Sequence, residues 1–133
     1  MAEPTQTILV VDDDPDTLTY LTTILEDHGY SALSARDGTE ALKRIEESRP
    51  DLVALDISMP EKSGVAVYRA IKENDRLKDL PVIIVTGISE DFKKFISTRR
   101  SVPPPEGYLS KPVGAEQFLN LVKDLLQGSQ RDS

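Results

Sequence analysis

Acidic side chains follow two apolar runs of the sequence, at the point where each run stops. Three aspartates, Asp12–Asp14, come after residues 8–11, and Asp56 comes after residues 52–55. Carboxylates packed closely repel one another, so a folded chain must expose them, protonate some of them or neutralise them with a cation. Mg²⁺ prefers hard oxygen ligands and needs only one or two carboxylates from a protein, so a magnesium site is one chemistry that these residues suit.

A hydroxyl and an ammonium close two later runs. Thr86 follows residues 82–85, and Lys111 follows the shorter run of residues 107–110. A carboxylate can act as a nucleophile and become an acyl phosphate. The charge that develops on the phosphoryl oxygens then needs a metal, an ammonium and hydrogen-bond donors. Carboxylates, a hydroxyl and an ammonium are together the groups that phosphoryl transfer uses.

Strand and helix patterns alternate along the chain, and this alternation would bring those groups together. Apolar runs predict strands at residues 8–11, 52–55 and 82–85, and the short segments 31–34 and 107–110 are further candidate strands. Apolar residues at helical spacing predict helices at residues 17–28, 65–72, 89–98 and 115–127, and Thr39 is predicted to cap a further helix that runs through residue 48. Such alternation predicts right-handed crossovers and a parallel sheet with helices on both faces. The carboxyl ends of parallel strands share one edge, which is where open α/β sheets bind ligands.

Length and composition limit the classes of protein. The 133 residues make one domain, predicted at residues 1–128, with a frayed polar tail at residues 129–133. The absence of cysteine excludes disulfides and thiolate metal sites. A net charge of -7 argues against direct binding of nucleic acid, because phosphates would be repelled. No apolar run approaches the ~20 residues of a membrane span, and no signal peptide opens the chain, so we expect a cytoplasmic domain without a membrane partner.

Plainer interpretations of the same residues stay open on the sequence alone. Asp12–Asp14 can be a capping cluster, because acids are common at a helix N-terminus, and Asp14 itself is predicted to be an N-cap. Thr86 can be an ordinary strand end, and Lys111 can be a solvated lysine like most others. The bond from Lys111 to Pro112 fits a cis conformation, although most such bonds are trans.

Four motifs, in order and each at a predicted strand end, resemble the receiver domain of response regulators in two-component signalling. They are VVDDD at Val10–Asp14, LDISMP at Leu55–Pro60 with Gly64 beyond it, VTG at Val85–Gly87 and YLSKPV at Tyr108–Val113. The resemblance covers the chain from Thr7 to the final helix. It implies an α/β fold in which a doubly wound, five-stranded parallel sheet has the flavodoxin-like strand order 2-1-3-4-5.

The resemblance also implies which residues receive the phosphoryl group and hold the metal. Asp56 would be the phosphoacceptor. Mg²⁺ would be held by Asp12, Asp13 and Asp56, together with the backbone carbonyl of Ser58. Charge and burial by themselves do not decide which of the aspartates is the nucleophile.

A second set of residues would respond to phosphorylation, again by resemblance. Thr86 would bind a phosphoryl oxygen and change position on activation, and Lys111 would pair with the phosphoryl group. Tyr108 would move between outward and inward rotamers, although its spacing is equally compatible with simple packing. Gly87 is small enough to leave room for the phosphoryl group.

The function that the resemblance implies is a phosphorylation-activated signalling switch. A sensor histidine kinase or a phosphotransfer protein would donate a phosphoryl group to Asp56 with Mg²⁺ bound. The added charge would change the surface that binds a downstream effector. Such a domain catalyses only its own phosphorylation and dephosphorylation, so we expect a switch protein rather than an enzyme.

Two alternatives belong to other classes. A Mg²⁺-dependent phosphatase with an aspartate nucleophile would need Asp-x-Asp-x-Thr or Asp-x-Asp-x-Val after the first strand, and residues 12–16 miss the last position. An interaction module that is never phosphorylated can share the same scaffold, but the complete set of acids, hydroxyl and lysine argues against it.

One stretch departs from the family pattern. Residues 99–107, RRSVPPPEG, stand where the family has a short turn that contains glycine. The prolines Pro103–Pro105 exclude a helix or a central strand there, so a stiff, exposed loop is predicted. The family's usual output face lies in this region, and a rigid loop would block or reshape it.

Overall fold

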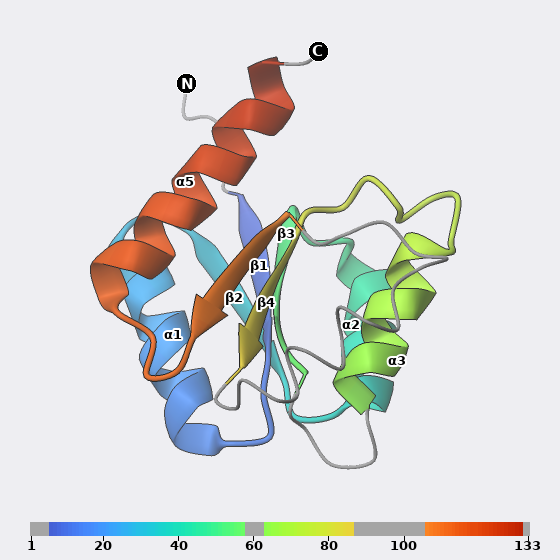
Figure 1. Cartoon of the computed structure of the whole chain (residues 1–133), viewed down its shortest axis with the longest axis horizontal. Helices are drawn as coiled ribbons and strands as arrows, with labels where there is room; N and C mark the ends of the chain where they lie inside the picture. Colours follow the sequence, from blue (N-terminus) through green and yellow to red (C-terminus); the bar gives the residue numbers. More distant parts are fainter. Residues whose placement is uncertain (1–5, 58–62, 87–105, 132–133) are drawn as a thin grey trace.

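A five-stranded parallel sheet with helices on both faces forms the protein, as the computed structural model shows in Figure 1. The structure describes residues 6–57, 63–86 and 106–131. The strands are β1 (Thr7–Val11), β2 (Ser31–Ala35), β3 (Leu52–Asp56), β4 (Val82–Thr86) and β5 (Gly107–Ser110). The helices are α1 (Pro15–Asp27), α2 (Gly38–Ser48), α3 (Ser63–Lys72) and α5 (Ala115–Arg131). The helix predicted at residues 89–98 and the loop at Pro103–Pro105 lie outside the described residues.

The strand order is β2-β1-β3-β4-β5, and all neighbouring strands run parallel, which confirms the predicted topology. Val11 lies opposite Ala35 on one side and Leu55 on the other, and Leu55 lies opposite Ile84. The central strands therefore end nearly level with one another. Side chains that follow these strands meet at a single edge, the lower edge of the sheet in Figure 1.

Each face of the sheet has its own apolar core, because successive strand residues point to opposite faces. On β1, Ile8 and Val10 pack with residues of α1 and α5, whereas Leu9 and Val11 pack with residues of α2 and α3. Figure 1 shows the same division, with α1 and α5 on one side of the sheet and α2 and α3 on the other. Strands buried on both faces explain the continuous apolar runs of the sequence. Within the described ranges, no helix is both long and apolar enough to cross a membrane.

Two aspartates begin helices next to the carboxyl edge. Asp14 is the N-cap of α1: its side chain accepts a hydrogen bond from the backbone N–H of Asp16 at 3.1 Å and from the Thr17 hydroxyl at 2.8 Å. Those two bonds, with that from Thr17 the stronger, lower the pKa of Asp14. The predicted N-cap role of Asp14 is confirmed. Asp37 caps α2 in the same way, so this helix begins at Gly38, and the prediction that Thr39 is its cap is wrong.

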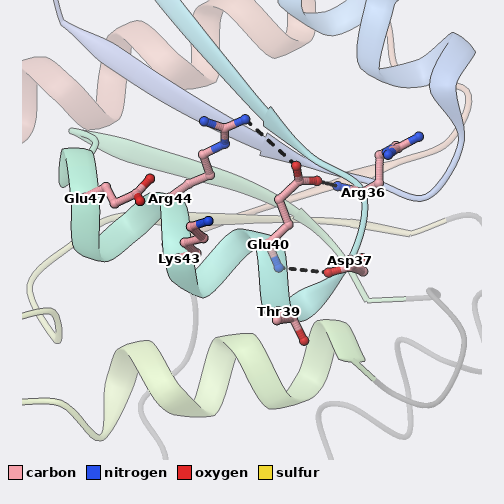
Figure 2. A pocket seen from close by; sticks show the side chains of 7 residues that line it. All are labelled: Arg36, Asp37, Thr39, Glu40, Lys43, Arg44 and Glu47. Atoms are coloured by element: carbon pink, nitrogen blue, oxygen red, sulfur yellow. Dashed lines mark hydrogen bonds and ion pairs between the residues drawn. The ribbon is translucent and has the colours of Figure 1, made fainter.

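The N-terminus of α2 carries a shallow pocket of mixed charge, shown in Figure 2. Glu40 accepts a hydrogen bond from the backbone N–H of Arg36 at 2.7 Å, and it forms an ion pair with Arg44 at 3.8 Å. Asp37 accepts from the backbone N–H of Glu40 at 2.8 Å. Asp37 and Glu40 are satisfied by local partners, so helix capping and surface pairing account for their positions here.

The other end of the sheet is held by a buried lysine. Lys72, the last residue of α3, has a side chain that is 1% exposed, and its ammonium lies 3.0 and 2.9 Å from the two carboxylate oxygens of Glu106. It also donates to the carbonyl oxygen of Leu80 at 3.4 Å. Glu106 in turn accepts from the backbone N–H of Val82 at 2.7 Å. One ion pair therefore joins α3 to the starts of β4 and β5.

We expect Glu106→Ala to lower the free energy of unfolding by about 2 kcal/mol, because it leaves the buried Lys72 ammonium without its carboxylate. This expected loss of unfolding free energy is smaller than for a fully buried ion pair, because the Glu106 side chain is 33% exposed. Urea denaturation measures the change. The matched control is Asp75→Ala, which removes the exposed partner of Lys78 and should leave the unfolding curve unchanged. Equal effects of the two substitutions would contradict the anchoring role of Glu106.

Candidate functional site

Three carboxylates meet at the carboxyl edge of the sheet. Asp12 and Asp13 directly follow β1, and Asp56 is the last residue of the neighbouring strand β3. One oxygen of each lies within 4.8 Å of the others. Asp12 and Asp56 are each only 1% exposed, whereas Asp13 is exposed. Burial of two neighbouring carboxylates is costly, so this cluster differs from the acidic patches common on protein surfaces.

An ammonium reaches this cluster from the edge strand. Lys111 follows β5, and its Nζ lies 2.8 Å from Oδ2 of Asp12 and 3.2 Å from Oδ2 of Asp56. Its side chain is 25% exposed, and the Lys111–Pro112 peptide bond is cis. A single lysine thus forms ion pairs with both buried carboxylates and lowers their mutual repulsion.

Burial and charge act against each other in this group. Burial raises the pKa of Asp12 above its ordinary value, and the charge of Asp56 adds to the rise. Hydrogen bonds from Lys111 and from the backbone N–H of Asp14 oppose it without cancelling it. For Lys111, burial works to lower the pKa, but the hydrogen bond to Asp12 and the charges of Asp56 and Asp12 outweigh it and leave the pKa raised. The lysine is therefore fully charged at neutral pH.

The ligands on offer suit a small divalent cation. Asp12, Asp13 and Asp56 present only carboxylate oxygens, which are hard ligands of the kind that Mg²⁺ prefers. When all are ionised, three carboxylates against the one ammonium of Lys111 leave two negative charges uncompensated. A divalent cation matches that excess in both charge and ligand type.

Helix α3 begins in close contact with the strand that carries Asp56. A Cβ atom on Gly64 would overlap the carbonyl oxygen of Asp56 and would lie 2.6 Å from Cα of Ile57. Only glycine fits this approach, since real Cβ atoms essentially never come so near to backbone atoms. Gly64 therefore sets how closely α3 packs against the end of β3.

The remaining predicted site residues are placed to different degrees. Thr86 is the last residue of β4 and lies opposite Ser110 of β5, at the same edge of the sheet as Asp56. Tyr108 lies on β5 and is 38% exposed. The side chain of Thr86 is not described, and Ser58 and Gly87 lie outside the described residues. The roles given to these residues remain predictions.

Sequence reasoning missed one contact beside the site. The hydroxyl of Tyr20, on α1, donates a hydrogen bond to the backbone carbonyl of Val113 at 2.9 Å. The partners are 93 residues apart in the chain, so no local pattern pointed to their meeting. The contact links α1 to the segment that carries Lys111.

Comparison with known families agrees with this geometry. A model described as the response regulator receiver domain matches residues 8–123. The polar-differentiation response regulator DivK of Brucella anthropi is 33% identical over 121 residues, which cover 91% of this chain and 96% of DivK. The alkaline phosphatase synthesis transcriptional regulatory protein PhoP of Bacillus subtilis is 32% identical, and the match covers 92% of this chain but 49% of PhoP.

Solved structures show the same arrangement. The receiver domain of a signal transduction histidine kinase from Syntrophus aciditrophicus superposes with a TM-score of 0.84 at 32% identity, covering 96% of this chain and 94% of that one. A CheY-like response regulator receiver domain from Methanospirillum hungatei also gives a TM-score of 0.84, at 26% identity, covering 98% of this chain and all of the other. The match therefore extends over nearly the whole length of both chains.

Gly64→Ala is expected to lower the free energy of unfolding by about 1–3 kcal/mol, because the added methyl group forces α3 away from the backbone of Asp56. Denaturant unfolding measures this loss. Gly114→Ala is the matched control: its Cβ would meet Oε1 of Gln117 at 3.4 Å, a side-chain atom that can move, so little change is expected. A Gly64→Ala protein as stable as the Gly114→Ala protein would contradict the close approach.

Proposed function

Since the chain belongs to the response regulator receiver domain family, we propose that it is a phosphorylation-dependent signalling switch with Asp56 as the phosphoacceptor. The observation that carries the proposal is the position of Asp56. Its carboxylate is buried at the carboxyl edge, 3.2 Å from the Lys111 ammonium and grouped with Asp12 and Asp13. A buried carboxylate beside a fixed ammonium and two further acids is the arrangement that phosphoryl transfer to an aspartate requires.

Mg²⁺ is the metal that we assign to the acidic cluster. Asp12, Asp13 and Asp56 would hold it, together with the backbone carbonyl of Ser58, which comes from the family pattern. When bound, the ion supplies positive charge against the phosphoryl oxygens. The exposed position of Asp13 supports this assignment, because Mg²⁺ keeps several of its waters and needs access to solvent.

The transfer itself uses few groups of the chain. An oxygen of Asp56 attacks phosphorus and forms the new P–O bond, while the bond from phosphorus to the donor breaks and its electron pair leaves with the donor. Lys111, whose Nζ lies 3.2 Å from Oδ2 of Asp56, stays close enough to pair with the charge of the phosphoryl group. Thr86, at the end of β4, would donate its hydroxyl proton in a hydrogen bond to a phosphoryl oxygen.

The consequence of transfer is a change of charge at a site where three carboxylates already lie close together. A phosphoryl group replaces one carboxylate charge with about -1.5 to -2 and adds strong acceptor oxygens. Thr86 and Lys111 belong to β4 and to the segment after β5, so their response would reach the surface around Tyr108. That surface would then bind its downstream effector differently.

The donor that we propose is a histidine kinase or a phosphotransfer protein, the partners of the receiver family. Outside its own phosphorylation and dephosphorylation, the domain would have no catalytic turnover. The labelling experiment below separates the unphosphorylated interaction module from this proposal. Measurable turnover of a phosphomonoester would instead favour the phosphatase.

A small phosphodonor such as acetyl phosphate should label the protein on Asp56 only when Mg²⁺ is present. Intact-protein mass spectrometry measures the label. Asp56→Asn is expected to abolish labelling because the nucleophilic oxygen is lost, whereas Asp16→Asn, on the exposed surface of α1, should label like the unmodified protein. Labelling that persisted in Asp56→Asn would refute the phosphoacceptor assignment. No labelling of the unmodified protein would favour the unphosphorylated interaction module.

Mg²⁺ should raise the melting temperature of the protein, because it binds the folded cluster. At about a hundredfold excess over its dissociation constant, it stabilises the folded state by about 2.7 kcal/mol. Asp13→Asn should abolish this gain and, without Mg²⁺, should stabilise the protein by removing one of three like charges. Asp16→Asn, outside the cluster, should keep the full response. Loss of the response in Asp16→Asn, or its retention in Asp13→Asn, would contradict the metal assignment.

A further inference from the structure

Tyr20 combines an exposed ring with a well-placed hydroxyl. It lies on α1 and is 45% exposed, so its ring is only partly used in packing. Its hydroxyl donates to the carbonyl oxygen of Val113 at 2.9 Å, a good hydrogen-bond distance. The fixed contact that this residue makes with the far end of the chain is therefore polar and is directed at one backbone group.

The backbone group that Tyr20 binds belongs to the segment that carries Lys111. Strand β5 ends at Ser110 and helix α5 begins at Ala115, so the residues between them lie outside both strand and helix. Val113 is the point where this segment turns back into the core, since its side chain is buried among residues of α1 and α5. Tyr20 thus attaches the segment to α1 two residues beyond Lys111.

The position of this segment decides where the Lys111 ammonium lies. Its Nζ reaches Asp12 at 2.8 Å and Asp56 at 3.2 Å, and these two carboxylates belong to different strands. A lysine side chain has four flexible carbons, so its ammonium is held at two partners only if its backbone is held as well. A shift of about 1 Å in a positioned group can cost a large factor in rate.

We propose that Tyr20 is a positioning residue for Lys111. Its hydrogen bond to Val113 holds the segment after β5 against α1, and this keeps the ammonium placed between Asp12 and Asp56. The inference rests on the proposed function, in which Lys111 pairs with the phosphoryl group on Asp56. It adds a residue of α1, outside the group of charged side chains, to the machinery of the reaction.

The test is Tyr20→Phe, which keeps the ring and removes one hydroxyl. In saturating Mg²⁺, the rate of labelling by acetyl phosphate should fall about fivefold, the effect of losing about one neutral hydrogen bond. The backbone amides of residues 111–115 that can exchange should exchange faster with solvent, because the segment opens more often. The matched control is Tyr30→Phe, which removes the hydroxyl of a partly buried tyrosine packed on the same core. It should change neither the rate nor the exchange of these amides.

The two measurements separate positioning from a general structural role. A structural role alone would lower the stability of Tyr20→Phe but leave the labelling rate of the folded protein unchanged, and that result overturns the proposal. A fall in the labelling rate of equal size in Tyr30→Phe also overturns the proposal. A fivefold fall with faster exchange confined to residues 111–115 supports it.

Failure of the proposed function gives a different pattern. If the unmodified protein is not labelled at all, the phosphoacceptor assignment fails, and the positioning role is decided by a double-mutant cycle. The free energy of unfolding is compared among Tyr20→Phe, Lys111→Ala and the double variant. Coupling between the two substitutions supports positioning, because neighbours that act through one segment are not additive. Additive losses overturn it.

Discussion

Mutual repulsion among the acids at the carboxyl edge is the constraint on which the site depends. Asp12 and Asp56 are buried at the ends of adjacent strands, and Asp13 lies beside them on the exposed side. Lys111 joins the two buried acids, and its raised pKa shows that their attraction outweighs its burial. The charge is still not balanced, so the edge favours a divalent cation and responds strongly to any change of charge on Asp56.

The sheet can carry this cluster of acids because apolar packing, and not the acids, stabilises the sheet. Apolar side chains fill both faces of the strands, and the two cores fix the register of β1 against β3. The carboxylates extend beyond these cores at the strand ends, where the parallel arrangement collects them. A stable scaffold can therefore carry a cluster of like charges that would be costly as part of the core.

Strand β5 is attached by a lysine at each of its ends, and the two lysines serve different purposes. Lys72 and Glu106 fix its start to α3 and β4, far from the acids. Lys111 connects its other end to the carboxyl cluster, and Tyr20 supports that end from α1. In the proposed switch, the Lys72–Glu106 pair holds the start of β5 while the charge beside Lys111 changes, so β5 and Tyr108 are well placed to respond to phosphorylation of Asp56.

The sequence by itself determined the strands, the alternation with helices and the strand ends at which the charged residues stand, because burial on both faces and helical spacing leave local patterns. It also predicted that Asp14 is a cap, which depends on neighbours within one helical turn. Tertiary structure alone decided which groups touch: that Lys111 joins Asp12 to Asp56, that Gly64 lies against the backbone of Asp56, and that Tyr20 binds Val113. These contacts join residues from different strands and helices, so they depend on how the sheet and its helices pack, and no local pattern in the chain encodes them.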